Sequence, residues 1–410
     1  MGQAISTREQ HPGQNLDAHE RAPPLLPYAA LIAEFGEAPL GTMSGARGSG
    51  MERWRCVVPT HATRTRYGEV PRYEEGLYDL GNRLYAWLVP NGSWGESNAG
   101  LIVGDGEALL VDTQWDAEHT RTMLEAMGTV LAGLPLKYVV NTHADGDHFW
   151  GNELVTSAES IASQAAYEEM LLLHPRSMVQ LGVLGRVLGW VRLFGAGKVG
   201  YWFGAMVAPY NFHGAVRTPA RRHFTGEETL RVGGRTVKLI EVGPAHTQGD
   251  LLAYLPDEKV LFAGDVVFIG STPVMWAGPI ENLLTALDRI LGMDVEVVVP
   301  GHGPITDKSG VRQVRAYWEF VELQTRRRYE AGMSAGAAAR DIALSREFAR
   351  QPFATWNSPE RMMVNTHMQY RHYAGRTAHL NNLERLNIMR KQALLAHELP
   401  DAQPQVMRKR

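Results

Sequence analysis

Four potential metal ligands lie within six consecutive positions of the chain, directly after the apolar run 138–140. The pattern is HxDxDH, and its members are His143, Asp145, Asp147 and His148. Imidazole nitrogens and carboxylate oxygens bind zinc-type ions at about 2.0–2.2 Å, and a tight turn can direct several of them at one small volume. The alternative is a polar loop with unrelated histidines and turn-forming aspartates. The spacing favours a metal site.

Three more candidate ligands follow later strand-like segments. His246 comes after the apolar residues 236–242, Asp265 after 260–263 and His302 after 295–299. Glycine or proline stands beside each of them and lets the backbone turn sharply. Loops that follow strands gather at one edge of a sheet, so this repeated order of strand, turn and ligand strengthens the prediction of a metal centre.

The order of these motifs resembles that of the metallo-β-lactamase-fold hydrolases, in which an early Asp after a strand precedes HxHxDH, a later His, a bridging Asp and a final His. Asp112 matches the early Asp, and the likeness covers about residues 78–310. The resemblance implies an α/β fold, the αββα sandwich. It also implies two metal sites: His143 and His246 for the first, Asp147, His148 and His302 for the second, with Asp265 bridging them.

Asp145 departs from the family pattern, which has a second His at this position. A carboxylate oxygen is harder than an imidazole nitrogen, so it shifts metal preference toward iron or manganese without excluding zinc. Alternatively, Asp145 points away and one metal site is incomplete. We expect one or two zinc ions as the cofactor, with iron or manganese as alternatives.

The surrounding residues predict how such a site would work. Asn141, Thr142 and Asp112 are placed to fix the imidazole tautomers through hydrogen bonds. A divalent metal lowers the pKa of bound water from near 15.7 to around 7 and polarises a carbonyl. By the resemblance, Asp147 is the catalytic candidate that orients the nucleophile; its alternative role is that of a ligand only. Serine chemistry is not indicated, because the chain has no GxSxG motif.

Composition limits the other classes of function. The formal net charge of −3 argues against nucleic acid as the main partner. Cys56 is the only cysteine, so no disulfide framework exists within the chain. The sequence has no uninterrupted apolar run of about eighteen residues. We therefore expect a cytoplasmic protein with a small-molecule substrate and no membrane partner; the oligomeric state stays open.

The domain organisation follows from changes in composition along the 410 residues. We expect a disordered leader at 1–50, a catalytic domain at 51–310, a helical C-terminal extension at 311–398 and a basic tail at 399–410. Strands are predicted at 84–89, 101–103 and 108–111. A helix is predicted from a cap at Asp116 to a stop at Gly128, and another at 281–292.

An aromatic-rich insertion at about 171–224 interrupts the catalytic domain. It is either the ordinary core of an inserted helical hairpin or the wall of a pocket for a bulky apolar or aromatic substrate. The candidate pocket residues are Trp190, Phe194, Tyr201, Trp202 and Phe203.

Our leading hypothesis is a metal-dependent hydrolase of an acyl ester, thioester or lactone with a bulky apolar group. The chain also resembles a subgroup that includes cyclases and thioesterases of aromatic polyketide synthesis, which would use the metals to polarise carbonyls. This likeness is carried by residues 141–152, 95–100 and 359–361. An alkylsulfatase or phosphodiesterase is a further alternative, because the metal ligands alone do not indicate which electrophilic group of the substrate is attacked. The last alternative is a catalytically weak metal-binding protein.

Overall fold

The computed structural model describes residues 51–191 and 195–408. The expected leader at 1–50 and the candidate pocket residue Phe194 lie outside the described residues. Within the described residues, the strands form two sheets, one of eight strands and one of five.

The eight-stranded sheet keeps the order of the chain. Its strands are β1 (Arg55–Pro59), β2 (Gly76–Gly81), β3 (Leu84–Leu88), β4 (Ala99–Val103), β5 (Ala108–Val111), β6 (Leu136–Val140), β7 (Glu159–Ser163) and β8 (Arg222–Phe224). The strands pair antiparallel as far as β5, and β5 to β8 run parallel. The predicted strands at 84–89, 101–103 and 108–111 correspond to β3, β4 and β5.

The five-stranded sheet has the order β13-β12-β11-β10-β9. Its strands are β9 (Glu227–Val232), β10 (Arg235–Glu241), β11 (Leu251–Leu255), β12 (Val260–Phe262) and β13 (Val297–Val299). Only β12 and β13 pair in parallel; the other pairs are antiparallel. Every residue of β11, β12 and β13 is buried, which explains why these strands read as continuous apolar runs rather than as alternating patterns.

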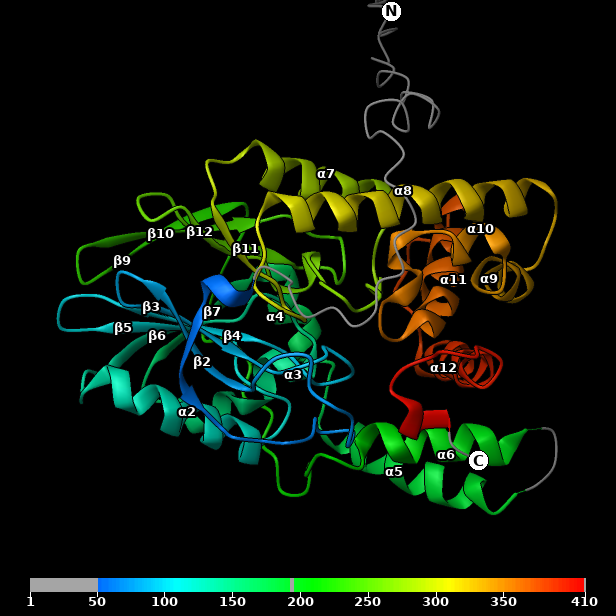
Figure 1. The fold of residues 1–410 in the computed structure, drawn as a ribbon, viewed down its shortest axis with the longest axis horizontal. Coiled ribbons are helices and arrows are strands. Elements are labelled where there is room, and N and C mark those ends of the chain that lie inside the picture. Colours follow the sequence, from blue (N-terminus) through cyan, green and yellow to red (C-terminus); the bar gives the residue numbers. More distant parts are fainter. Residues whose placement is uncertain (1–50, 192–194, 409–410) are drawn as a thin grey trace, which may run out of the picture. The chain divides into compact units, whose positions relative to one another are not determined.

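Helices cover the outer faces of both sheets. The longer helices are α2 (Ala117–Leu131), α5 (Arg176–Gly189), α6 (Ala196–Val207), α7 (Ile280–Gly292), α8 (Lys308–Glu330), α9 (Ala335–Ala343), α11 (Met362–Tyr373) and α12 (Asn382–Ala396). The shorter ones are α3 (Gly146–Phe149), α4 (Gln164–Met170) and α10 (Arg346–Ala349). Figure 1 shows α2 below the sheets, and α7 and α8 above them. The expected αββα sandwich is therefore confirmed.

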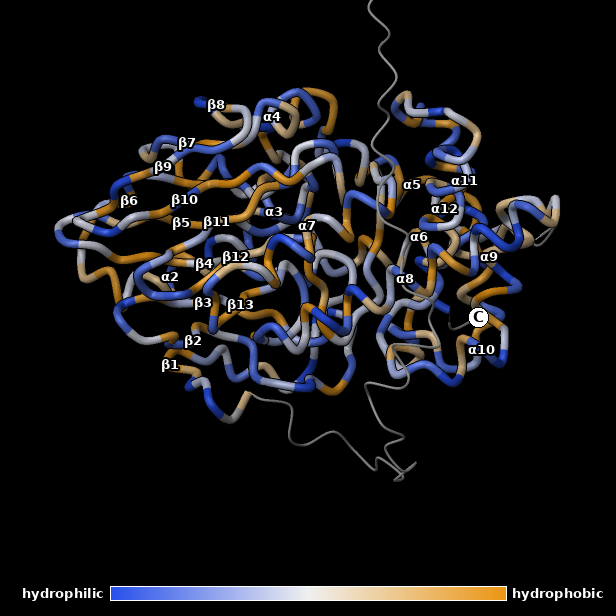
Figure 2. Tube along the Cα trace, turned by 90° about the horizontal axis from the view of Figure 1, so that it is seen from above, coloured by the Kyte–Doolittle hydropathy of each residue, from blue (hydrophilic) through white to orange (hydrophobic). Residues whose placement is uncertain are grey.

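Three apolar clusters hold these layers together, and Figure 2 shows the central strands as hydrophobic bands. One cluster packs Met123 and Met127 of α2 against the first sheet. The second fills the space between the sheets, with Leu109 and Leu239 among its members. The third joins the second sheet to α7, α8 and the C-terminal helices. None of the described helices has both the length and the apolar composition of a membrane span.

The predicted start of α2 is correct, whereas its predicted end is wrong. The side chain of Asp116 accepts a hydrogen bond from the backbone N–H of His119 and caps the helix, as expected. The helix does not stop at Gly128 but continues to Leu131, and Ala132 then adopts a left-handed conformation. A glycine inside a helix costs only about 1 kcal/mol relative to alanine, which packing against the sheet outweighs.

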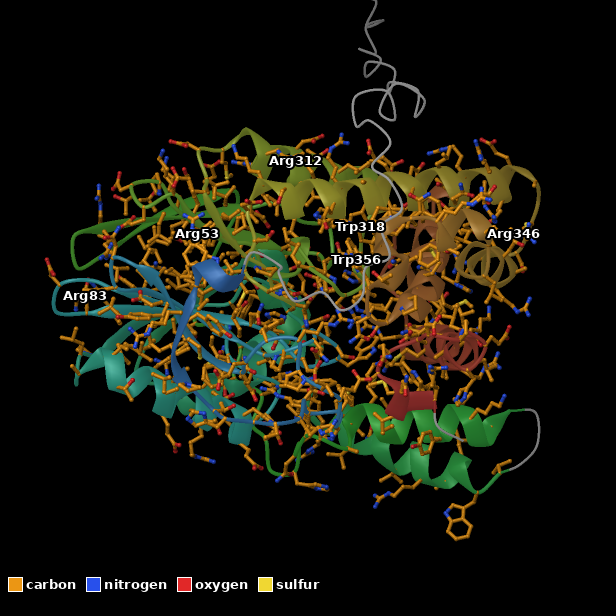
Figure 3. All side chains as sticks on the ribbon, viewed as in Figure 1. Arg53, Arg83, Arg312, Trp318, Arg346 and Trp356 are labelled. Atoms are coloured by element: carbon orange, nitrogen blue, oxygen red, sulfur yellow. The ribbon has the colours of Figure 1, made fainter. Side chains whose placement is uncertain are left out.

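The predicted C-terminal helices share the core of the sandwich. Trp318 of α8 is fully buried, and its neighbour Tyr317 has its ring centroid 5.8 Å from that of Trp356. Figure 3 shows Trp318 and Trp356 beneath α8, toward the C-terminal helices. The extension predicted at 311–398 is thus an integral layer of packing rather than an appendage.

The described part of the expected basic tail, residues 399–408, is not frayed. Leu399, Ala402 and Met407 are buried, and a 3-10 helix spans Gln405–Arg408. Arg408 donates hydrogen bonds to the backbone oxygens of Leu399 and Ala402. The apolar residues between the charges of this basic segment therefore dock on the body of the protein.

Replacing Met407 by alanine tests this docking. Because the side chain is 1% exposed, its truncation should lower the free energy of unfolding by about 2–4 kcal/mol in chemical denaturation. The exposed Asp401→Ala change in the same segment is the control and should have little effect. Equal stability of both variants would contradict the docked conformation.

Candidate metal centre

Loops from both sheets meet where the candidate ligands lie. Asp112 follows β5, the HxDxDH loop follows β6, Asp265 follows β12 and His302 follows β13. His246 lies in the loop between β10 and β11. The parallel pairs β5–β6 and β12–β13 place the carboxyl ends of their strands together, so the sandwich brings residues from distant parts of the sequence to one edge.

Two glycines allow these loops to approach each other. A Cβ atom at Gly301 would lie 1.9 Å from Oδ1 of Asp265, which no side chain can tolerate. Gly264 has a φ of +49°, and a Cβ there would meet Oγ1 of Thr142 at 2.6 Å. These glycines therefore permit the close approach of β12 and β13 loops to the HxDxDH loop.

The candidate ligands form two buried triads whose ligand atoms lie within 4.8 Å of one another. The first triad is His143, His246 and Asp265, and the second is Asp147, His148 and His302. Asp265 joins the triads. Its Oδ2 is 3.7 Å from Nε2 of His143, 3.3 Å from that of His246 and 3.4 Å from that of His302, and its Oδ1 is 3.2 Å from Nε2 of His148.

For three of the four histidines, hydrogen bonds at the outer ring nitrogen determine which nitrogen carries the proton when the ring is neutral. Nδ1 of His148 lies 2.9 Å from the Asp112 carboxylate, and Nδ1 of His246 lies 2.7 Å from the carbonyl oxygen of Val274. Both partners are acceptors, so in a neutral ring Nδ1 carries the proton and Nε2 presents a lone pair.

His143 follows the same rule through Thr142. The Thr142 hydroxyl donates its proton to Asp112 at 2.7 Å and lies 2.9 Å from Nδ1 of His143, so that Nδ1 must be the donor. Nε2 of His143 and of His148 are buried and have no hydrogen-bond partner. Lone pairs and carboxylate oxygens thus converge on one volume, and a cation is the group that this donor set fits.

The pKa shifts of the candidate ligands indicate that positive charge is favoured between the triads. Burial disfavours the charged form of His246, but the carboxylates of Asp265 and Asp145 outweigh it and raise its pKa to about 10. The pKa of His148 and that of His302 are raised in the same way, against the effect of burial. Burial would raise the pKa of Asp265, yet the surrounding histidines hold it well below its usual value.

Asp145 points toward the first triad rather than away from it. Its Oδ2 lies 3.1 Å from Nε2 of His246, and its side chain is 24% exposed. The carboxylate therefore lies on the solvent-accessible side of the first triad. Asp145 is not a member of either triad, but its carboxylate lies beside the first one.

The predicted outer residues lie where they can position the histidines. Asp112 accepts hydrogen bonds from the backbone N–H and hydroxyl of Thr142 in addition to contacting His148. Asn141 donates to the backbone oxygen of His148 and to Oδ1 of Asn152. These contacts support the HxDxDH loop from behind, while the ligand atoms face the cation position.

Three residues next to the triads were not among the candidate site residues. The ring of Phe268 stacks on His302 with a centroid distance of 4.9 Å and an interplanar angle of 1°. Ser97 donates a hydrogen bond to the backbone oxygen of Asp147 at 2.7 Å. The guanidinium carbon of the buried Arg361 lies 5.5 Å from the centroid of Phe268. Ser97 and Arg361 stand in stretches that carry the subgroup likeness, whereas no sequence pattern pointed to Phe268.

The candidate pocket residues of the insertion separate into two groups. Trp202 and Phe203 are buried in an apolar cluster, and Trp202 packs edge-on against Trp94, so they are part of the core. Trp190 and Tyr201 line an apolar groove of about 1530 Å³ along α5 and α6. Tyr210 and Phe212 line the same groove and contact Trp115.

Changing Asp112 to asparagine should weaken zinc binding by about 10–100-fold, because the amide no longer holds Nδ1 of His148 as a carboxylate does. Competition with a chelator measures the affinity. Asp116→Asn is the matched control, since Asp116 is also buried and contacts a histidine, His119, outside the triads. Unchanged affinity in the Asp112 variant would contradict the positioning role.

Changing His246 to alanine should remove at least one bound ion while the fold persists, which elemental analysis and circular dichroism measure together. The partly buried His119→Ala change serves as the control and should leave metal content unchanged. Full metal content in the His246 variant would rule out its role as a ligand.

Comparison with known proteins gives a consistent assignment. Residues 92–302 match the family model described as the metallo-beta-lactamase superfamily. The chain is 25% identical over 244 residues to the 2,4-dinitroanisole O-demethylase subunit alpha of Nocardioides sp. (strain JS1661), which covers 57% of this chain and 61% of that protein. It is 30% identical over 136 residues to a hydroxyacylglutathione hydrolase of Methylococcus capsulatus, which covers 33% of this chain and 52% of that protein.

A solved structure has a fold similar to that of this chain. The stereoselective inverting sec-alkylsulfatase Pisa1 from Pseudomonas sp. superimposes with a TM-score of 0.58 at 18% identity, covering 76% of this chain and 51% of that one. The chain therefore spans between half and two thirds of the length of these relatives. Since the family model covers more than half of the chain and the fold agrees, the chain belongs to the metallo-beta-lactamase superfamily.

Proposed function

We propose that this protein is a metal-dependent hydrolase of an acyl ester, thioester or lactone with a bulky apolar group. The observation that carries the proposal is the convergence of four inward-facing imidazole nitrogens on the carboxylate of Asp265. His143, His246 and Asp265 would hold one ion, with Asp145 as an additional ligand. Asp147, His148 and His302 would hold the other. Imidazole and carboxylate ligands suit zinc, and iron or manganese are alternatives.

Divalent ions bound there would lower the pKa of coordinated water toward about 7 and polarise the substrate carbonyl. The side chain of Asp147 is 13% exposed, and its Oδ2 lies 3.4 Å from Nε2 of His302. At this position its carboxylate can accept a hydrogen bond from the attacking water and orient it toward the carbonyl carbon. Asp147 is thus our catalytic candidate, and Ser97 positions its backbone.

The aromatic surroundings support an apolar substrate group. Trp150 stands two positions after His148 in the chain, and its ring centroid is 5.7 Å from that of Phe212. Phe212 and Tyr210 line one end of the groove along α5 and α6. Each methylene group buried in such a groove contributes about 0.8 kcal/mol, so chain length should strongly affect substrate selection. The relative named hydroxyacylglutathione hydrolase agrees with an acyl substrate.

A second candidate, hydrolysis of a sulfate ester, is favoured by one observation. Arg361 is buried and forms no ion pair within the described residues; Nη1 donates hydrogen bonds to Ser271 and Thr272, and Nε has no partner. Its guanidinium lies against Phe268, which stacks on His302. A buried cation near the site would favour an anionic group on the substrate.

The test compares acetyl and decanoyl esters, the corresponding coenzyme A thioesters, lactones of both sizes and decyl sulfate, using the zinc-loaded protein. We expect free acid as the product and a kcat/KM at least about tenfold higher for decanoyl than for acetyl compounds, owing to methylene burial. His246→Ala should lose this activity. A zinc-loaded protein that hydrolyses none of these compounds would refute the proposal.

Decyl sulfate separates the two candidates. If the sulfate ester is the preferred substrate, Arg361→Lys should reduce its kcat/KM more than that of the decanoyl ester, because lysine keeps the charge but loses the planar geometry. An equal reduction for both substrates would refute the second candidate and leave Arg361 with a packing role.

A further inference from the structure

The insertion has an unusual distribution of charge. Residues 171–226 contain no aspartate or glutamate, although the whole chain has a formal net charge of −3. The basic residues of this segment are Arg176, Arg186, Arg192, Lys198, Arg217, Arg221 and Arg222. Arg222 pairs with Glu159 and Glu228. Arg176, Arg186 and Lys198, in contrast, are exposed and form no ion pair within the part of the chain that the structure describes.

Large apolar side chains are exposed beside these charges. Val183, Val187 and Trp190 are 45%, 59% and 88% exposed, and their spacing of four and three residues places them along one face of α5. Arg186 lies on the same side of the helix, next to Val187. Together with Arg176 and Lys198, these residues form what we call the basic-apolar face of the hairpin.

The basic-apolar face does not hold the hairpin together, because α5 and α6 contact each other through other residues. The helices approach through glycines: a Cβ atom at Gly185 would lie 2.7 Å from the backbone nitrogen of Gly204, and one at Gly200 would lie 2.4 Å from that of Gly189. Close backbone packing through small residues does not need large side chains. The valines and the tryptophan are therefore free to contact something outside the described structure.

The length of α5 limits what that contact can be. Its fourteen residues span about 21 Å at 1.5 Å per residue, which is less than the roughly 30 Å of a bilayer core. A short helix with arginine, aliphatic residues and tryptophan on one face suits the interface between lipid headgroups and acyl chains. Figure 1 shows α5 and α6 at the lower edge of the view, on the side opposite α8.

We propose that the basic-apolar face of the hairpin docks on the surface of an anionic lipid bilayer. Trp190 and the valines would enter the acyl boundary, and Arg176, Arg186 and Lys198 would contact the anionic headgroups. Charge complementarity is the reason for choosing this partner over a second copy of the chain, because two identical acid-free surfaces would repel each other. This inference departs from our expectation of no membrane partner. Arg186, Trp190 and Lys198 also line the groove that we assign to the apolar part of the substrate, but vesicle binding can be measured without substrate.

The experiment is co-sedimentation of the full chain with vesicles. One set consists of phosphatidylcholine alone, and the other contains phosphatidylglycerol in addition. We expect binding to the anionic vesicles, with little binding to the neutral ones. Arg186→Glu with Lys198→Glu should reduce this binding at least about tenfold, since each basic residue near such a surface contributes on the order of a fivefold gain in affinity. Val187→Ser with Trp190→Ser should also reduce it.

Matched variants away from the hairpin provide the controls. Arg312→Glu with Arg346→Glu reverses two exposed charges outside the hairpin, and Figure 3 shows Arg312 by α8 and Arg346 by the C-terminal helices, above α5 and α6. Leu344→Ser removes an apolar side chain that is 41% exposed, similar to Val183. Both control variants should bind anionic vesicles more tightly than the hairpin variants do.

Three results would overturn the inference. The first is that the protein does not bind anionic vesicles, and the second is that the hairpin and control variants lose vesicle binding equally. The third is that the protein does not bind vesicles but forms a dimer in analytical ultracentrifugation, and that the Trp190 variant is a monomer. The last result would identify the face as a contact between two copies of the chain. None of these measurements involves substrate, so they stand apart from the test of hydrolysis.

Discussion

The arrangement of the centre depends on one electrostatic constraint: several hydrogen-bond acceptors face one another in a buried volume. In their neutral rings, the inward nitrogens of His143, His148 and His246 carry lone pairs, because their outer nitrogens donate to acceptors. They surround the carboxylate of Asp265, which is an acceptor as well. Such a cluster needs positive charge, and the raised pKa values of His148 and His246 reflect this need. A metal ion in place of the protons would stabilise both the loops and the fold that carries them.

The sandwich satisfies this constraint by bringing loops of two sheets to one edge. The HxDxDH loop belongs to the first sheet, whereas Asp265 and His302 belong to the second. Each sheet alone would present an incomplete set of ligands, so packing between the sheets and assembly of the centre are coupled. Gly301 is required at the point of closest approach, since a side chain there would overlap Asp265. The C-terminal helices add Arg361 to this region and share the core of the second sheet.

The fold and the positions of the candidate ligands could be predicted from the sequence because both rest on local patterns. Apolar runs predict the strands, and the polar residues after each run mark the loops. The burial of Trp202, the docking of Met407 and the place of Arg361 beside Phe268 could not be predicted, because they arise from contacts between segments far apart in the chain. Composition indicated a basic segment at the C-terminal end, whereas its conformation depends on packing against the rest of the chain. Likewise, Asp145 breaks the family pattern in sequence, and only its distance to His246 indicates on which side it lies.

The most direct test of the central claim is an anomalous-scattering measurement at the zinc edge on crystals of the zinc-loaded protein. The account predicts two peaks, one within bonding distance of His143 and His246, the other within bonding distance of Asp147, His148 and His302, with Asp265 between them. Absence of zinc from this volume, or zinc bound only elsewhere on the chain, would contradict it.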